Sequence, residues 1–366
     1  MTQKIKVVVI VGARPNFMKA APLLRAMRAG KKIEPVLIHT GQHYDQTMSG
    51  SFFEDLKLPK PDLFLNVGSG THAAQTAKIM LALESELIRL NPRLVIVVGD
   101  VNSTIAAALT AKKLGIQVAH VESGLRSFDE TMPEEINRIL TDHISDYLFV
   151  TESSGIKNLR REGIDSGKIF FVGNVMIDSL YQNLPQINRS EIIGKIGVTK
   201  KNYAVLTLHR PVNVDAKESL AKILKIITEA VVDTEVVFPV HPRTRKNFEA
   251  ILADESIDPR RIKVVEPLGY LDFNALVKDS LFVLTDSGGI QEETTALGIP
   301  CITLRETTER PITVILGTNH IAGTDPKKIT AIIKKIKQGK NKKNHQVPKW
   351  DGRAAERVVK ILQKKL

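Results

Sequence analysis

The amino-acid sequence predicts an α/β protein with two doubly wound parallel sheets. Short runs rich in Val and Ile alternate with longer amphipathic stretches, which is typical of strands that alternate with helices. The apolar residues in these short runs are mostly continuous rather than alternating with polar ones, as expected for strands that helices cover on both faces. The alternation restarts after a polar stretch at residues 181–202, which indicates a second sheet.

The expected strands follow the chain in two groups. The first group lies at residues 5–11, 35–38, 94–98, 118–121, 147–150 and 169–172, and the second at residues 203–208, 236–240, 262–264, 281–285 and 301–304. We therefore expect two Rossmann-like domains that face a central cleft, one of residues 1–175 and one of residues 176–350. The last stretch, at about 353–366, has apolar residues at helical spacing and is expected to form an amphipathic helix.

Composition excludes several classes of protein. The chain carries 52 Lys and Arg against 40 Asp and Glu, but residues 327–366 hold 14 of the basic residues and 2 of the acidic ones. The rest is balanced at 38 of each, so the surplus gives no reason to expect a nucleic-acid partner. The single cysteine, Cys301, excludes an intramolecular disulfide and a Cys-cluster metal site. No apolar run approaches the ~20 residues of a membrane-spanning helix, so we expect a cytoplasmic protein without membrane insertion.

Polar residues follow nearly every expected strand, at the end where open α/β sheets bind ligands. These segments begin at Gly12, Thr40, Gly99, Glu122, His209, His241, Asp286 and Arg305. Their number and charge predict a charged substrate at the strand ends. The nine histidines lack the spacing of metal ligands, and no metal is expected.

The segment Ser287-Gly288-Gly289 at the start of an expected helix is suited to phosphate. Two glycines let backbone N–H groups approach phosphate oxygens closely, and Glu293, one turn later, could accept hydrogen bonds from ribose hydroxyls. The alternative is a plain strand–turn–helix connection. The guanidinium of Arg310, in a nearby polar segment, favours diphosphate recognition.

Four carboxylates form a second group of candidate residues. Asp100 and Glu122 end successive expected strands, while Glu134 and Glu135 follow Pro133 at a helix start. For the pair at the helix start, the alternative is simply that the helix dipole favours acidic residues there. Several carboxylates at one site can divide into acid and base, with His209 as a further candidate.

Taken together, the motifs resemble one family of enzymes. They are Gly12-Ala13-Arg14-Pro15 with Lys19, Thr40-Gly41-Gln42-His43, Gly99-Asp100, His120-Val121-Glu122-Ser123-Gly124-Leu125-Arg126, Met132-Pro133-Glu134-Glu135-Ile136-Asn137-Arg138, Leu208-His209-Arg210, Asp286-Ser287-Gly288-Gly289-Ile290-Gln291-Glu292-Glu293 and Thr308-Glu309-Arg310-Pro311. From about residue 5 to residue 325 the chain resembles the non-hydrolysing UDP-N-acetylglucosamine 2-epimerases. The resemblance implies a glycosyltransferase-B-type fold, a last helix that returns to the first domain, and a homodimer.

The resemblance also implies roles for individual residues. Phe273 would lie near the uracil and Glu293 on the ribose. The diphosphate would be held by Arg14, Ser287, Gly288, Gly289 and Arg310. The positions around the sugar would be Lys19, Asp100, Glu122, Glu134 and His209.

The implied reaction interconverts UDP-N-acetylglucosamine and UDP-N-acetylmannosamine, a supply step for cell-surface polysaccharides. It proceeds by elimination and re-addition of UDP, and no cofactor is expected because the loop after the first strand has only Gly12 and no GxGxxG. The alternatives are a 2-epimerase of a UDP-diacetamido-uronic acid, a hydrolysing relative, a glycosyltransferase of the same fold, and a non-catalytic sensor.

Some family members bind a second nucleotide sugar as an activator. By resemblance, Gln42, Glu135 and His241 match that second site, whereas Pro211 and Asp45 stand where polar contacts are expected. Proline has no side-chain donor and a carboxylate repels a diphosphate. We therefore expect hyperbolic kinetics without an activator.

Overall fold

The chain forms two compact units, each built on a parallel sheet. The computed structural model describes residues 4–42, 60–240, 242–253 and 261–366. Unit 1 comprises Met1–Gln182 and Pro348–Leu366, and unit 2 comprises Asn183–Val347. Both sheets alternate with helices along the chain, so the predicted fold class is confirmed.

Unit 1 contains a seven-stranded sheet in the order β3-β2-β1-β4-β5-β6-β7, with every neighbouring pair parallel. The strands are β1 (Ile5–Val11), β2 (Ile33–His39), β3 (Leu63–Phe64), β4 (Leu94–Val98), β5 (Gln117–Ser123), β6 (Tyr147–Val150) and β7 (Ile169–Phe171). The helices are α1 (Arg14–Ala29), α3 (His72–Leu90), α4 (Asn102–Lys113), α5 (Pro133–Ile144), α6 (Ser153–Arg161), a 3₁₀ turn η1 (Ser166–Lys168), α7 (Val175–Ile187), which extends past the unit boundary, and α16 (Ala354–Lys365).

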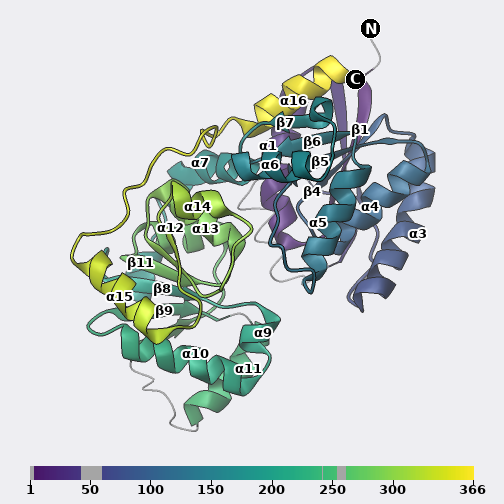
Figure 1. The fold of residues 1–366 in the computed structure, drawn as a ribbon. Coiled ribbons are helices and arrows are strands. Elements are labelled where there is room, and N and C mark those ends of the chain that lie inside the picture. Colours follow the sequence, from purple (N-terminus) through teal and green to yellow (C-terminus); the bar gives the residue numbers. More distant parts are fainter. Residues whose placement is uncertain (1–3, 43–59, 241, 254–260) are drawn as a thin grey trace. The chain divides into compact units, whose positions relative to one another are not determined.

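The helices of unit 1 lie on both faces of this sheet (Figure 1). The crossover β1–α1–β2 runs toward one edge and β4–α4–β5 toward the other, and right-handed crossovers then place α1 and α4 on opposite faces. Helix α5 follows β5 in the same direction as α4, and the two helices pack together. Helix α16 packs on α1. The carboxyl ends of β4 and β5 therefore lie between α1 on one face and α5 on the other.

Unit 2 contains a six-stranded parallel sheet in the order β10-β9-β8-β11-β12-β13. Its strands are β8 (Tyr203–Thr207), β9 (Glu235–Pro239), β10 (Ile262–Val265), β11 (Phe282–Thr285), β12 (Cys301–Thr303) and β13 (Asn319–Ile321). Its other helices are α8 (Ile192–Ile196), α9 (Pro211–Val214), α10 (Lys217–Ala230), α11 (Pro242–Ala253), α12 (Tyr270–Lys278), α13 (Gly288–Leu297), α14 (Pro311–Ile315) and α15 (Pro326–Lys337).

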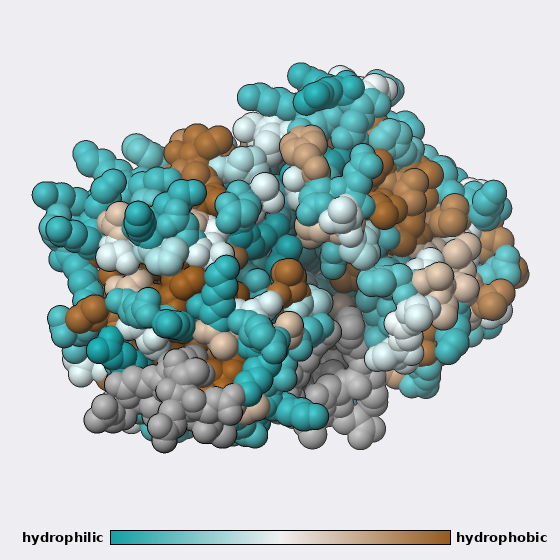
Figure 2. Space-filling model, turned by 60° about the horizontal axis from the view of Figure 1, so that its bottom comes forward, coloured by the Kyte–Doolittle hydropathy of each residue, from teal (hydrophilic) through white to brown (hydrophobic). Residues whose placement is uncertain are grey.

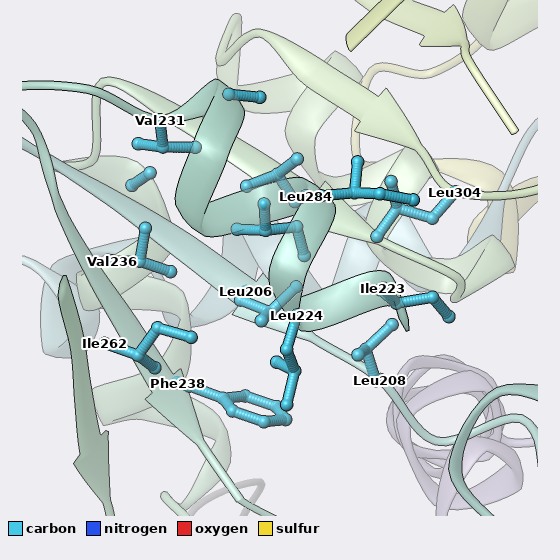
Figure 3. Close-up of a cluster of buried hydrophobic side chains, with 14 of the residues drawn as sticks. Leu206, Leu208, Ile223, Leu224, Val231, Val236, Phe238, Ile262, Leu284 and Leu304 are labelled. Atoms are coloured by element: carbon cyan, nitrogen blue, oxygen red, sulfur yellow. The ribbon is translucent and has the colours of Figure 1, made fainter. Parts of the chain in front are cut away.

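Buried aliphatic side chains hold α10 and α15 on the sheet of unit 2. Figure 3 shows part of this cluster, in which Leu224 of α10 lies beside Leu206 of β8 and the ring of Phe238 of β9. On α15 the side chains of Ile329, Ile333 and Ile336 are buried, while its lysines are exposed, so the basic stretch is a solvated helix face. No helix in the described part of the chain is both long and apolar enough to cross a membrane.

Candidate functional site

The acidic candidates of unit 1 gather around the ends of β4 and β5. Asp100 follows β4 directly, and Glu122 is the penultimate residue of β5. Glu134 lies in the first turn of α5, after Pro133 at the first helical position. This start suits acidic side chains, since the dipole of α5 stabilises negative charge there.

Glu122 has an unusual backbone conformation. Its φ angle is +76°, in the left-handed region that few residues other than glycine adopt. The pairing of β5 with β6 shifts register between Val121 and Ser123, so Glu122 forms a β-bulge. Its carboxylate pairs with Lys19 of α1, with 2.6 Å between Nζ and Oε2, and both side chains are buried.

Asp100 and Glu135 share one cation. Arg138 of α5 pairs through Nη1 with Asp100 and through Nη2 with Glu135, the second at 2.6 Å. The side-chain amide of Asn137, the preceding residue, donates to the backbone carbonyl of Asp100 at 2.9 Å. Helix α5 thus holds Asp100 in place through two adjacent residues.

Glu134 differs from the other two acidic candidates. Its side chain is half-buried, and within the described residues it forms no ion pair. Asp100, which is also half-buried, and the buried Glu122 each have a cation at contact distance that compensates their charge. Of the three, Glu134 is therefore the carboxylate least committed to a protein partner.

Two of the residues expected at a second nucleotide site accept hydrogen bonds from other residues of unit 1. Glu135 accepts hydrogen bonds from the backbone N–H groups of Ser127 and Phe128 besides pairing with Arg138. Gln42 accepts through Oε1 from the backbone N–H and the hydroxyl of Ser103, at 2.9 and 2.7 Å. Both side chains are buried and act as internal supports.

Three residues of the sequence predictions fall outside the description. His241 and Asp45 are not among the described residues, and neither is the side chain of Arg14, whose backbone begins α1. Pro211 is described and begins the short helix α9.

In unit 2, His209 is held by an aspartate. His209 follows β8 and Asp286 follows the neighbouring strand β11. The ring Nδ1 lies 2.8 Å from Asp286 Oδ1, and the histidine side chain is 54% exposed whereas the aspartate is fully buried. Asp286 also accepts from the backbone N–H groups of His209 and Arg210 and from Asn213 Nδ2. Burial raises the pKa of Asp286, but the contacts to His209 and Asn213 outweigh it, and the net pKa is lowered.

This arrangement orients the histidine ring. Because Asp286 is an ionised acceptor, Nδ1 of His209 carries a hydrogen and donates it. Nε2 is then the ring nitrogen available for a proton transfer or a ligand hydrogen bond.

The start of α13 brings Ser287, Gly288 and Gly289 together beneath an arginine. A Cβ atom on Gly288 would lie 2.3 Å from Nη1 of Arg310, so a larger residue here would displace this guanidinium. Arg310 is itself paired with Glu292 and Glu309. An anion at this turn would meet a guanidinium whose charge is already balanced within unit 2.

Helices α12 and α13 pack together and carry the remaining candidates of unit 2. Glu293 is buried on α13, and Phe273 is half-buried on α12, one turn after Tyr270. The pKa of Tyr270 is raised well above its ordinary value by burial, and also by the charge of Glu293 and a hydrogen bond to it. Tyr270 is therefore a neutral donor toward Glu293.

The sequence predictions missed three residues with structural consequences for the site: Arg138, Asp142 and Asp286. Arg138 and Asp286 stand inside the motifs that carry the family resemblance, and Asp286 begins one of the polar segments at the strand ends, but no role was predicted for either. Within the described residues, no three His, Cys, Asp or Glu side chains gather as a metal site requires.

Comparison with known proteins identifies close relatives. The model of the family described as UDP-N-acetylglucosamine 2-epimerase matches residues 25–363. A Methanocaldococcus jannaschii protein named UDP-N-acetylglucosamine 2-epimerase is 46% identical over 365 residues, 98% of this chain and 99% of the relative. A crystal structure of the M. jannaschii enzyme with UDP-GlcNAc and UDP superimposes with a TM-score of 0.90 at 45% identity, covering 98% of this chain and all of the other.

A second relative carries a different name. The Pseudomonas aeruginosa UDP-2,3-diacetamido-2,3-dideoxy-D-glucuronate 2-epimerase is 40% identical over 323 residues, which cover 87% of this chain and 88% of the relative.

Proposed function

The chain belongs to the UDP-N-acetylglucosamine 2-epimerase family of isomerases, and from this premise we propose that it interconverts UDP-N-acetylglucosamine and UDP-N-acetylmannosamine. The observation that carries the proposal is the group of three carboxylates, Asp100, Glu122 and Glu134, around the ends of β4 and β5. Inversion at C2 requires removal of a proton from one face of the sugar and its return on the other. Acid–base groups of this kind can perform both transfers.

The proposed reaction is an elimination followed by a re-addition. A carboxylate takes the C2 proton while the bond between C1 and the diphosphate oxygen breaks, and the electron pair of that bond leaves with UDP. The products are a glycal and UDP. A proton then adds to C2 from the opposite face, and UDP adds back at C1. No oxidant takes part, since proton and leaving group both return.

The contacts described above support a division of roles. Glu134 has no ion-pair partner within the described residues and is proposed to carry one of the two protons, while Asp100 and Glu122, each paired with a cation, are the candidates for the other. In unit 2, Ser287, Gly288, Gly289 and Arg310 are proposed to hold the diphosphate, with Glu293 on the ribose and Phe273 beside the uracil. His209, oriented by Asp286, is proposed to protonate or orient the leaving phosphate oxygen through Nε2.

Deuterium incorporation tests the mechanism directly. In D₂O, UDP-N-acetylglucosamine alone is expected to give UDP-N-acetylmannosamine that carries deuterium at C2. The reaction is followed by ¹H NMR, in which the C2 proton signal should disappear. Retention of the original hydrogen, or a need for added nicotinamide, would exclude the elimination. A need for an acceptor sugar would instead favour a glycosyltransferase.

The P. aeruginosa relative favours one alternative substrate, a UDP-diacetamido-uronic acid. The same carboxylates would invert C2 in either sugar. A panel of UDP-sugars, each incubated singly and followed by NMR, separates the two. We expect UDP-N-acetylglucosamine to give the highest kcat/KM.

We further propose that the enzyme is a cytoplasmic homodimer that supplies cell-surface polysaccharide synthesis. Support for the dimer comes from exposed apolar side chains on α3 and α5, which both pack against α4. They are Ala73, Ala77, Leu81 and Ile88 of α3 and Ile136 and Leu140 of α5. Figure 2 shows that the face in view is mostly hydrophilic, with apolar patches among the polar ones.

Light scattering tests the oligomer. We expect twice the chain mass of 40.5 kDa for the wild type and a monomer for Leu81→Asp combined with Ile136→Asp. Val212→Asp, at an exposed apolar residue of unit 2, is the matched control and should stay dimeric. A monomeric wild type would contradict the proposal.

A further inference from the structure

A histidine and an aspartate form a fully buried pair beside the acidic group of unit 1. Nδ1 of His120, in the middle of β5, lies 2.7 Å from Oδ1 of Asp142 on α5. The other ring nitrogen, Nε2, lies 2.8 Å from the backbone oxygen of Gly99, the residue before Asp100. Neither side chain has any exposure to solvent, so neither can contact a substrate directly.

The surroundings of the ring determine its protonation. A backbone carbonyl only accepts hydrogen bonds, so Nε2 of His120 carries a hydrogen. Asp142 already receives the guanidinium of Arg126 at 2.7 Å and the backbone N–H of Gly124 at 3.0 Å, so it is ionised. Burial raises the pKa of Asp142, but His120 and Arg126 outweigh it and the pKa is lowered. Nδ1 then donates to Asp142 while Nε2 donates to the carbonyl of Gly99.

Asp142 binds the chain on both sides of Glu122. One carboxylate oxygen holds the side chain of His120, two residues before Glu122, and the other holds the backbone N–H of Gly124, two residues after it. Arg126, which also contacts Asp142, is anchored in turn by Glu162 at 2.7 Å. A single carboxylate thus spans the bulge in β5.

That bulge needs such a restraint. In a regular strand, the side chains of residues 120 and 122 would point to the same face, toward α5. The left-handed backbone at Glu122 breaks this alternation, and the side chain pairs with Lys19 of α1, on the other face of the sheet. A left-handed conformation at a residue other than glycine costs roughly 1–3 kcal/mol, and surrounding contacts must hold it.

The position of Asp142 in its helix is itself unfavourable. It lies in the last turn of α5, where the helix dipole disfavours negative charge. It is also completely buried, and a buried charge is stable only with close partners. Its contacts to His120, Gly124 and Arg126 supply those partners, and all three belong to the segment around Glu122.

We propose that the His120–Asp142 ion pair is a positioning pair that holds the bulge at Glu122 and so keeps the Glu122 carboxylate beside Lys19. Through Nε2 the same histidine fixes the carbonyl that precedes Asp100. The inference deepens the proposed function and rests on Glu122 being one of its acid–base groups. Neither member of the pair touches the substrate.

Asp142→Asn tests the pair against a closely matched control. Asp146 also accepts a backbone N–H from β5, that of Val118, and also pairs with a cation, Lys112, but at the other end of the strand. We expect Asp142→Asn to lower kcat about 10–100-fold, the range of a small misplacement of a reacting group, with KM and UDP affinity within about twofold. Asp146→Asn should leave kcat within about twofold. Equal losses of kcat in the two variants would overturn the proposal.

A double variant shows whether the pair acts through Glu122. In a Glu122→Gln background, Asp142→Asn should lower kcat by less than about twofold, because the group it positions has already been removed. Losses that multiply would mean that Asp142 acts elsewhere. His120→Gln replaces Asp142→Asn in this cycle should the latter fail to fold.

Two measurements on the full-length protein do not depend on turnover. ¹⁵N NMR at neutral pH should show both ring nitrogens of His120 protonated, and a neutral ring would overturn the ion pair. Hydrogen exchange at the amide of Gly124 should accelerate in Asp142→Asn and stay unchanged in Asp146→Asn. If the wild type epimerised no UDP-sugar, the proposed function would fail, while these two results would still decide whether the pair holds the bulge.

Discussion

Glu122 in unit 1 and His209 in unit 2 are both candidate acid–base groups, and they are held in different ways. Glu122 is buried, its backbone is left-handed, and it has a lysine at contact distance. His209 is half-exposed, but an aspartate buried beneath it fixes one ring nitrogen. Unit 1 therefore positions its functional side chain through backbone shape, and unit 2 through one side-chain hydrogen bond. Substitutions in each unit, compared by their effects on kcat, should show how much each of these two ways of positioning contributes.

The largest effect is expected from removing the carboxylates of unit 1. Asp100→Asn, Glu122→Gln and Glu134→Gln should each lower kcat by ~10²–10⁴-fold, the range of lost acid–base catalysis, with UDP affinity largely unchanged. Their stabilities should differ, because Glu122→Gln leaves Lys19 buried without its counter-charge, whereas Glu134 has no ion pair among the described residues. Activity assays, UDP titration calorimetry and Tm measure the three quantities.

Glu130, an exposed carboxylate in the loop before α5, gives the control for these variants. Glu130→Gln should retain wild-type kcat and Tm. A parallel loss of UDP affinity and rate in the three carboxamide variants would show that these carboxylates bind the nucleotide instead.

The fold was predictable because its central strands carry nearly continuous apolar runs. β1 and β4 are buried along nearly their whole length, so continuous runs of Val and Ile indicated them. The strands β3 and β13 were not predicted, since β3 has only two residues and β13 begins with the polar residues Asn319 and His320. Their pairing depends on the neighbouring strands.

The site was predictable only in part. Strand order explains why polar residues at strand ends point to Asp100, Glu122 and His209. The contacts that hold them join positions far apart in the chain, such as Lys19 with Glu122, and no local pattern reveals such a pair. The left-handed backbone at Glu122 was equally hidden, because glutamate has no preference for that conformation.

The next largest effect is expected from removing the hydrogen bond between Asp286 and His209 in unit 2. Asp286→Asn should lower kcat by about 10²-fold, because the amide no longer fixes the Nδ1 hydrogen of His209, and the ring can adopt the wrong tautomer. UDP affinity should change much less, since Asp286 itself is fully buried. Steady-state kinetics with a separate UDP titration measure the two effects.

Asp279 is the matched control in unit 2. It precedes β11 whereas Asp286 follows it, so the two lie at opposite ends of one strand. Its ion pairs with Lys278 and Lys200 lower its pKa against the effect of burial. Asp279→Asn should keep wild-type kcat, and a loss like that of Asp286→Asn would show that the effect is a general one on the stability of unit 2.

A smaller effect concerns a buried carboxylate held by backbone groups. Asp178 accepts from the N–H groups of Ala354 and Ala355 at the start of α16, and burial raises its pKa to about 6 from an ordinary value of 3.8. The folded state thus binds this proton more tightly, so stability falls as pH rises from about 4 to 6. The contribution is at most about 3 kcal/mol.

Asp178→Asn should remove that fall. The difference in unfolding free energy between the variant and the wild type is expected to increase in favour of the variant between pH 4 and pH 7. Trp350, the only tryptophan, is buried in unit 1 and reports its unfolding by fluorescence. Asp351→Asn is the comparison: Arg357 lowers the pKa of Asp351, so its own titration lies toward lower pH, and because the charge of Asp351 raises the pKa of Asp178, its loss should reduce the fall without removing it. A difference independent of pH would contradict the assignment.

The smallest expected effect is that of an added activator. Glu135 and Gln42 contact Arg138 and Ser103 within unit 1, and Pro211 offers no side-chain donor. We therefore expect hyperbolic kinetics, and no lag when the reaction starts from UDP-N-acetylmannosamine. Traces of UDP-N-acetylglucosamine should leave the initial rate within about twofold. Pro211→Gln provides the sharper comparison, because a gain of activation in that variant would place the missing contact at this position. A lag in the wild type would instead show that other basic groups have rebuilt the second site.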